Sequence, residues 1–130
     1  RFNQIHSLLM TIPGIGRTVS LILMAEIIDI KRFNSSEQLA AYIGMIPMCH
    51  CSGEHNGNGN ITVRRQAALR SVVVEAAWAA IRQDPALQLC YVNNCKRMPP
   101  GKAIIKVARK LINRIYFVLK RQQPYVQAVA

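Results

Sequence analysis

Acidic residues are scarce in this chain. Its 130 residues include 6 Asp and Glu against 17 Lys and Arg, which gives a formal net charge of +11. The few carboxylates are scattered, and nothing in their spacing suggests a site for two catalytic metal ions. We therefore predict no metal site in this chain and a polyanionic partner for it. The acidic residues are Glu26, Asp29, Glu37, Glu54, Glu75 and Asp84.

Long apolar runs and a leader sequence are also lacking. No uncharged run reaches the roughly 18 to 20 residues that a membrane-spanning helix requires, because Glu26 and Asp29 interrupt the most apolar stretch. We therefore expect no membrane partner. The chain opens on Arg1 without a signal peptide, which indicates a fragment of a longer protein. Four cysteines are too few for a disulfide scaffold, so we expect free thiols and a reducing cytoplasm.

The chain does contain enough apolar side chains to fold, since 51% of its residues are hydrophobic. Its length favours one domain, 1–130. Apolar residues recur at spacings of three and four and never alternate, which predicts an all-α domain of five or six helices. We expect these helices at about 2–11, 17–30, 35–44, 62–83, 85–96 and 101–122. The second is almost wholly apolar and is therefore predicted to be the central buried helix.

Capping residues mark several of the expected helix ends. Ser35 and Gln38 have the spacing of a capping box, and Gly44 is typical of a helix stop. Thr62 and Asp84 are N-cap residues, and a proline follows Asp84 at the first helical position. These signals place the third, fourth and fifth helices.

The first 30 residues have the form of a helix-hairpin-helix element, at about 2–30. Gly14 and Gly16 lack side chains, so backbone N–H groups at the start of the next helix can approach a DNA phosphate, aided by Arg17. Such contacts position a duplex without reading its sequence. The alternative is a tight corner between two helices that binds no ligand.

The last predicted helix, at about 101–122, carries one basic face opposite its apolar stripe. Five phosphate contacts from this face would give a salt dependence of about −4 to −5 in log–log slope. The alternatives are an ordinary charged surface and an anionic membrane surface. The five residues are Lys102, Lys106, Arg109, Lys110 and Arg114.

A loop without periodicity is expected at about 45–61, and loops this long are usually functional or disordered. Its two cysteines and two histidines lie too close together for the usual zinc ligand gaps. Ser52, before Gly53, is a candidate nucleophile on an exposed turn. A serine hydroxyl needs a base or a metal, and cations for the developing charge. The alternative is a plain loop serine.

An ordered series of short motifs resembles the C-terminal domain of the IS-one-ten family of insertion-sequence transposases. These proteins are also described as serine-type DEDD recombinases, and the Piv DNA invertase is a relative. The resemblance covers nearly all 130 residues. The motifs are Thr11-Ile12-Pro13-Gly14-Ile15-Gly16, Ala25-Glu26-Ile27, Arg32-Phe33, Leu39-Ala40-Ala41-Tyr42-Ile43-Gly44, Pro47, Ser52-Gly53, Ile61-Thr62, Leu69-Arg70, Glu75-Ala76-Ala77-Trp78 and Ala108-Arg109-Lys110-Leu111.

The resemblance implies an enzyme whose active site is built from two domains. An RNase H-like domain, absent here, would bind Mg²⁺ through four acidic residues, so no cofactor is expected in this chain. Ser52 matches the family serine that attacks the DNA backbone and forms a phosphoserine intermediate. The family also implies a guide RNA and a homo-oligomer. Met45, Ile46 and Met48, expected to be exposed, could serve oligomerisation.

The chain departs from the family pattern next to these motifs. Cys51 stands where the family usually has a second serine, and Cys51 is therefore a possible competing nucleophile. Arg65 replaces a glycine in the segment after Thr62. We expect Arg64, Arg65 and Arg70 to face the DNA backbone near the serine. For Arg70 the alternative is a salt bridge with Glu75 or Glu26.

The leading functional prediction is a DNA-binding, serine-bearing transposase domain that is inactive without the acidic domain. The first alternative is a non-catalytic helix-hairpin-helix module that binds nucleic acid. The second alternative is a helical interaction domain whose basic face meets an acidic protein.

Overall fold

The computed structural model of the chain describes residues 1–45 and 61–126. All regular structure in these two segments is helical, so the predicted all-α class is confirmed. None of the described helices combines the length and apolar character needed to cross a membrane. In chain order they are α1 (Phe2–Met10), α2 (Arg17–Ile27), the short 3₁₀ helix η1 (Ile30–Arg32), α3 (Ser36–Ile43), α4 (Val63–Gln83), α5 (Pro85–Cys95) and α6 (Pro100–Arg121).

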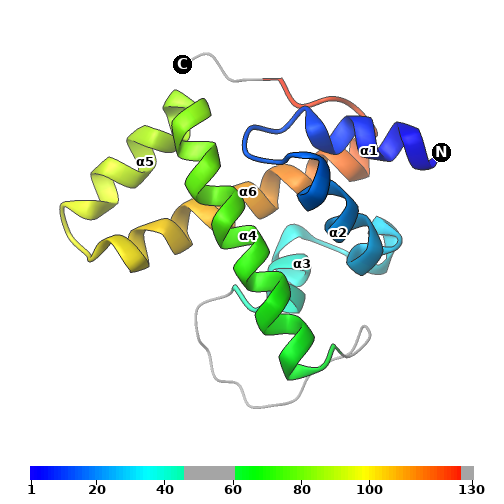
Figure 1. Cartoon of the computed structure of the whole chain (residues 1–130), viewed down its shortest axis with the longest axis horizontal. Coiled ribbons are helices and arrows are strands. Elements are labelled where there is room, and N and C mark those ends of the chain that lie inside the picture. Colours follow the sequence, from blue (N-terminus) through cyan, green and yellow to red (C-terminus); the bar gives the residue numbers. More distant parts are fainter. Residues whose placement is uncertain (46–60, 127–130) are drawn as a thin grey trace.

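The central helix is α6, not the second helix as the sequence predicted. Helix α6 runs through the middle of the molecule and contacts α1, α3, α4 and α5 (Figure 1). Ten of its residues are buried, whereas α2 buries only Ser20, Leu23 and Ile27. Helix α2 lies at the side of the molecule, which leaves the apolar residues Leu21 and Ile28 exposed. The apolar composition of the second helix led to the wrong prediction, because composition does not show how many other helices pack against a helix.

The apolar stripe expected on the last helix does form the core. Leu111, Ile112 and Ile115 are fully buried on α6. Helix α4 faces the core with small residues, among them Ala77 and Ala80, which are also fully buried. Small side chains let helix axes approach closely, so α4 can cross directly over α6 (Figure 1).

The second helix ends at Ile27, three residues earlier than expected. Ile28 adopts a positive φ of 64°. The Arg32 side chain folds back and donates hydrogen bonds to the carbonyl oxygens of Glu26 (3.1 Å) and Ile27 (2.7 Å). These bonds satisfy carbonyl groups that the end of a helix leaves open. The change of direction allows Phe33 to reach the core, where it is 1% exposed.

The predicted capping residues act as caps. The Ser35 hydroxyl accepts from the Gln38 N–H, and the Gln38 side chain accepts from the N–H of Asn34 rather than from that of Ser35. Gly44 ends α3 in the left-handed conformation, with φ 88°. The Thr62 side chain accepts from the N–H of Arg65 at the start of α4.

The Asp84 carboxylate joins the end of α4 to α6. Asp84 is 1% exposed. Its carboxylate accepts a hydrogen bond from the Ala86 N–H, which caps α5, and forms an ion pair with the Arg114 guanidinium at 2.5 Å. Burial by itself raises the pKa of a carboxyl group. Here the hydrogen bonds from Arg114 and Ala86, together with the charge of Arg114, outweigh burial and hold the pKa of Asp84 below its usual value.

The segment after α6 turns back towards the α1–α2 hairpin. Gln122 ends the helix in the left-handed region, with φ 58°. The Tyr125 N–H then donates to the Thr11 hydroxyl at 2.9 Å, and the centroid of the Tyr125 ring lies 4.7 Å from the Arg114 guanidinium. The C-terminal segment, the hairpin and the α4–α5 junction therefore meet at one end of the molecule (Figure 1).

The structure tests the predicted exposure of Met45 and the predicted free thiols. Met45 is 2% exposed, so the expectation that it is an exposed contact residue is wrong, because it packs in the core just after α3. Ile46 and Met48 lie outside the described residues. Cys90 and Cys95 are free thiols, as expected, while the other two cysteines fall in the part that is not described.

Candidate nucleic-acid interface

Gly14, in the predicted hairpin, packs against the C-terminal half of α4. Its φ is +91°, and a Cβ atom there would lie 2.5 Å from the Ala76 carbonyl oxygen and 2.7 Å from the Ala80 Cβ. Its N–H donates to the Gln83 side chain at 3.0 Å. Gly14 thus has a packing role in the corner between two helices, and its N–H is already used.

Gly16 occupies a different environment. It is the N-cap of α2, with φ −96°, and a Cβ atom there would meet nothing within 4 Å. No side chain caps this end of the helix, and Gly16, Arg17 and Thr18 are exposed. The first N–H groups of a helix have no partner within the helix, and together with the helix dipole they favour an anion. The part of the hairpin open to a phosphate is therefore Gly16–Thr18.

The three predicted arginines of α4 differ in whether they have an acidic partner. Arg64, Arg65 and Arg70 are all exposed. The Arg65 guanidinium lies 2.7 Å from the Glu26 carboxylate of α2. Arg70 forms neither of the salt bridges considered for it among the described residues, where the ion pairs are Arg65–Glu26 and Arg114–Asp84. Arg64 and Arg70 thus extend from α4 without an acidic partner in those segments.

The segment in which the chain departs from the family pattern has a structural role here. Arg65, in place of the family's glycine, links α4 to α2 through Glu26. Gln66, the next residue, donates to the carbonyl oxygens of Ala41 (3.2 Å) and Tyr42 (2.8 Å) at the C-terminus of α3. Arg65 and Gln66 therefore both tie the start of α4 to neighbouring helices.

The basic face of α6 is narrower than the sequence predicted. Lys102, Lys106 and Lys110 are exposed and follow one another at spacings of four. Arg109 is half-buried, and its Nε is buried without a hydrogen-bond partner among the described residues. Arg114 turns to Asp84, which balances its charge. Three lysines over roughly 12 Å of helix form the exposed face.

The structure separates the hairpin from the start of α4, where Arg64 and Arg65 lie. Gly14 lies against Ala76 and Ala80, whereas Arg64 lies 16 residues before Ala80 on the same helix, about 24 Å away along its axis. The Arg65–Glu26 pair places the C-terminal end of α2 at the start of α4, so the two helices run in opposite directions. A ligand that touches both regions must extend along α4.

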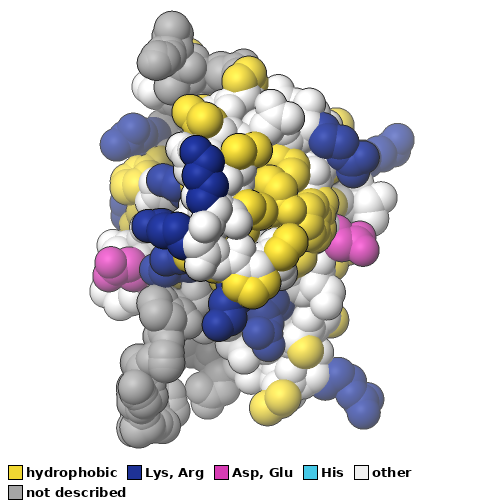
Figure 2. Space-filling view, turned by 90° about the vertical axis from the view of Figure 1, so that its left-hand side faces the viewer, with side chains coloured by type: hydrophobic (Ala, Val, Ile, Leu, Met, Phe, Trp, Pro, Cys, Tyr) yellow, Lys and Arg dark blue, Asp and Glu magenta, His cyan; other side chains and the backbone are white. Residues whose placement is uncertain are grey.

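Basic and apolar side chains also share the face that carries α5. Figure 2 shows hydrophobic side chains gathered at its centre, with Lys and Arg side chains around them. Exposed large hydrophobic residues of α4 and α5 include Trp78, Leu89 and Val92. The Trp78 ring packs edge-on against Tyr91 with centroids 5.4 Å apart, which fixes its orientation.

Ser52, the predicted nucleophile, lies outside the described residues, as do Cys51 and the histidines considered for zinc. The described residues immediately before and after that segment belong to the site region. They are Met45, buried at the end of α3, and Ile61, which precedes the Thr62 cap. The described residues on either side of the segment therefore adjoin the packed helices α3 and α4.

The described carboxylates do not fit a site for two metal ions. Glu26 and Asp84 are paired with arginines, and Asp29 accepts from the Lys31 N–H at the start of η1. No group of three or more His, Cys, Asp or Glu side chains that could hold a metal ion occurs within 1–45 and 61–126. These acids hold the helices together instead.

Comparison with known proteins gives consistent matches. The model of the transposase IS116/IS110/IS902 family matches residues 6–92, from α1 into α5. The transposase for insertion sequence element IS1111A of Coxiella burnetii is 30% identical over 119 residues, 88% of this chain and 33% of that protein. The pilin gene-inverting protein of Moraxella bovis is 33% identical over 127 residues, 95% of this chain and 39% of that protein.

A probable family 20 transposase of Pseudomonas aeruginosa is 26% identical over 121 residues, 90% of this chain and 36% of that protein. No solved structure matches the chain. The chain spans between a third and two fifths of the length of these curated relatives. Because the family model covers more than half of the chain, the chain belongs to the IS116/IS110/IS902 family of transposases.

Proposed function

We propose that the chain is the DNA-binding, serine-bearing part of a transposase or site-specific recombinase. Ser52 is the nucleophile for strand cleavage and rejoining. The observation that carries the proposal is the family match over residues 6–92, which runs through the segment that contains Ser52. A relative named for inverting a pilin gene is similar over 95% of this chain, which supports a role in DNA recombination.

The position of the arginines on α4 supports the same proposal. Arg64 and Arg70 lie in the helix that directly follows the serine segment, and both are exposed. A phosphodiester under attack gains negative charge, and guanidinium groups stabilise that charge. Arg64 and Arg70 are therefore the cations proposed to hold backbone phosphates near Ser52, each at a different phosphate because they are six residues apart on α4. Arg65 contributes less, because Glu26 already balances its charge.

The proposed reaction is a two-step phosphoryl transfer. The Ser52 hydroxyl gives its proton to a base, and its oxygen forms a bond to phosphorus while one strand end leaves as a hydroxyl. The DNA is then held as a phosphoserine ester. A strand hydroxyl attacks that phosphorus in the second step, which rejoins DNA and frees the serine. No external energy source is needed, because one ester is exchanged for another.

The base and the Mg²⁺ expected from the family must come from elsewhere in the full-length protein. Glu26, Asp29 and Asp84 are paired or capping groups, and no group of three or more possible metal ligands occurs within residues 1–45 and 61–126. The proposal therefore makes this chain one half of the active site, in cis or across a homo-oligomer. A guide RNA is a further proposed partner. A protein that acts on chromosomal DNA in this way would work in the prokaryotic cytoplasm.

Duplex DNA is proposed to contact Gly16 and Arg17 at the start of α2 and the lysine face of α6. With Lys102, Lys106 and Lys110 as its phosphate contacts, that face accounts for a log–log salt slope of about −2.7. Five contacts on α6 would account for about −4.5, and Arg17 adds about −0.9 in either case.

The catalytic part of the proposal is tested in the full-length protein. Ser52→Ala should abolish recombination and the covalent protein–DNA adduct, while DNA affinity stays within a few-fold. Cys51→Ala is the matched control, and it should keep both activities. Recombination by Ser52→Ala, or an adduct that disappears only with Cys51→Ala, would refute Ser52 as the nucleophile.

The DNA-binding part is tested by charge reversal in this chain. Lys106→Glu with Lys110→Glu should weaken duplex binding and reduce the magnitude of the salt slope by about 2. The control, Lys31→Glu with Lys120→Glu, changes the net charge equally at exposed positions outside the proposed contacts. Equal losses in the two double variants would show that binding follows net charge alone, which contradicts the proposed surface.

A further inference from the structure

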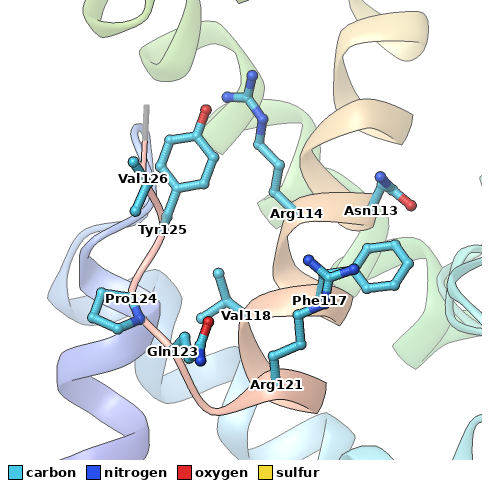
Figure 3. Close-up of a pocket in the computed structure, with 9 residues that line it drawn as sticks. All are labelled: Asn113, Arg114, Phe117, Val118, Arg121, Gln123, Pro124, Tyr125 and Val126. Carbon is cyan, nitrogen blue, oxygen red and sulfur yellow. The ribbon is translucent and has the colours of Figure 1, made fainter. Parts of the chain in front are cut away.

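A cavity lies between the C-terminal half of α6 and the segment that follows it. Its volume is about 320 Å³. Figure 3 shows α6 as one wall and the returning segment as the other, with the cavity open between them. The lining residues are Asn113, Arg114, Phe117, Val118, Arg121, Gln123, Pro124, Tyr125 and Val126.

Two aromatic rings among the lining residues, one from each wall, are each paired with a guanidinium group of α6. The Arg121 guanidinium lies 4.7 Å from the centroid of the Phe117 ring. The Arg114 guanidinium lies 4.7 Å from the centroid of the Tyr125 ring. In Figure 3 Phe117 and Arg121 extend from α6, and Tyr125 faces Arg114 from the returning segment. The cavity is therefore bordered by two flat cation–aromatic pairs.

One of these pairs is fixed in place by bonds that extend into the rest of the fold. Asp84, which is 1% exposed, holds Arg114, and the Thr11 hydroxyl holds the backbone of Tyr125. Asp84 also balances the charge of Arg114. Arg121 is exposed and forms no ion pair within the described residues. Arg121 is thus the cation available to a ligand, and Arg114 is a positioning residue for Tyr125.

The chemistry of the lining fits an unstacked nucleobase. Proteins that bind single strands stack bases on aromatic rings and guanidinium planes and contact base edges through amide side chains. Here Phe117 and Tyr125 supply rings, and Asn113 and Gln123 supply amides. The volume lies at the small end of the roughly 300–1,000 Å³ typical of ligand pockets, so it suits one nucleotide and not a duplex.

We propose that this cavity binds a single unpaired nucleotide of a nucleic-acid strand, with its base against Phe117 and Tyr125 and its phosphate at Arg121. The inference rests on the proposed binding of nucleic acid but is independent of Ser52. It assigns to the end of α6 a different task from that of the lysine face, which binds duplex phosphates.

The proposal is tested with a single-stranded oligonucleotide of about eight residues and a duplex of the same sequence, measured by fluorescence anisotropy. Tyr125→Ala should weaken single-strand binding by about 5- to 100-fold, the range for loss of one stacked base, and leave duplex binding within about two-fold. Tyr125→Phe keeps the ring and should bind normally. An oligonucleotide of abasic sites should bind Tyr125→Ala and the parent chain alike.

The phosphate contact has its own matched pair of variants. Arg121→Gln should reduce the magnitude of the single-strand salt slope by about 0.7, and Lys120→Gln, the same charge change at an exposed position outside the cavity, should leave the slope unchanged. Photocrosslinking of the parent chain to 5-iodouracil should map to Phe117 or Tyr125. Crosslinking needs no variant, so it answers the question even if Tyr125→Ala does not fold.

The outcomes separate this inference from the proposed function. Normal duplex binding, with single-strand affinity unaffected by Tyr125→Ala and crosslinks elsewhere, would overturn the nucleotide site alone. Failure to bind either strand form would overturn the DNA-binding function and the nucleotide site together. DNA and RNA oligonucleotides of one sequence, compared side by side, identify which strand is the source of the nucleotide. The site is supported if the DNA or the RNA oligonucleotide binds more tightly than the other and Tyr125→Ala removes that preference.

Discussion

Gly14 provides the sharpest test of how the hairpin is built. The structure gives it a packing role against α4, whereas the sequence suggested that both hairpin glycines approach a phosphate. Gly14→Ala would place a Cβ atom 2.5 Å from the Ala76 carbonyl oxygen and 2.7 Å from the Ala80 Cβ. Both neighbours belong to a buried helix face and cannot rotate away. The α1–α2 hairpin would have to shift from α4 to relieve the contact.

The expected cost has two parts. An L-residue in the left-handed region, which Gly14 enters with φ +91°, costs roughly 1–2 kcal/mol. Forcing an extra carbon into a packed contact costs about 1–3 kcal/mol. We therefore expect Gly14→Ala to reduce the free energy of unfolding by about 2–5 kcal/mol. That is a large fraction of the roughly 5–15 kcal/mol of a typical domain.

Gly16→Ala is the matched control for this prediction. Gly16 has an ordinary φ of −96°, and no atom lies within 4 Å of the position that an added Cβ would take. The cost should therefore stay below about 1 kcal/mol, which reflects a poorer N-cap. Its effect should appear in duplex binding instead, as several-fold weaker affinity, because the methyl group blocks close approach to the α2 N-terminus.

Urea unfolding followed by circular dichroism measures the first effect, and anisotropy titration with duplex DNA measures the second. A loss below about 0.5 kcal/mol for Gly14→Ala would refute the packing argument. If Gly14→Ala were stable but bound DNA poorly, the phosphate role first suggested by the sequence would be right for this glycine as well. Equal behaviour of the two variants would contradict the division drawn between them.

Three further predictions concern the bonds that join the helices. Asp84→Asn should cost about 3 kcal/mol at pH 7, because it removes the buried carboxylate that pairs with the partly buried Arg114 guanidinium. Because the folded-state pKa of Asp84 is lowered, its carboxylate stabilises the fold at neutral pH, and this stabilisation is lost as the pH falls below about 4. Urea unfolding between pH 6 and 3 should therefore show a free energy of unfolding that depends less on pH in the variant than in the parent chain. Arg65→Gln removes the pair with Glu26, in which the arginine side chain is 58% exposed and the glutamate side chain 20%. The free energy of unfolding should therefore change by less than about 1 kcal/mol in the same assay, and a larger loss would show that the pair is not screened by solvent. Gln66→Ala removes two hydrogen bonds to the end of α3 and should lower the free energy of unfolding by about 1–2 kcal/mol. A thermal midpoint equal to that of the parent chain would show that these bonds contribute nothing to stability.

Local signals in the sequence predicted the helices well because capping depends on residues that are close in the chain. Ser35, Thr62 and Asp84 each bond to an N–H two or three residues ahead, whatever the rest of the fold does. The end of α2 was harder to predict. Arg32 stops that helix from five and six residues away, and no standard capping pattern has this spacing.

The candidate site depended more on long-range contacts. Phe117 and Arg121 lie one helical turn apart, so their pairing could have been found from the i, i+4 spacing. No such signal joins Tyr125 to Arg114 or to Thr11, since the last contact spans 114 residues. Arg109 and Arg114 resemble the lysines of their face in sequence, and only packing shows that one has a buried Nε and the other a buried carboxylate partner.

The sequence by itself determined the helical class, the helix ends that are marked by caps, the apolar stripe of α6 and the resemblance to the transposase family. These follow from periodicity, caps and ordered motifs, which are properties of neighbouring residues. The tertiary structure alone decided that α6 is central, that Gly14 packs while Gly16 stays open, and that Asp84 and Glu26 bind two of the seventeen basic side chains. The physical reason is that a charge or a glycine acquires its role from what lies beside it in space, and those neighbours come from distant parts of the chain.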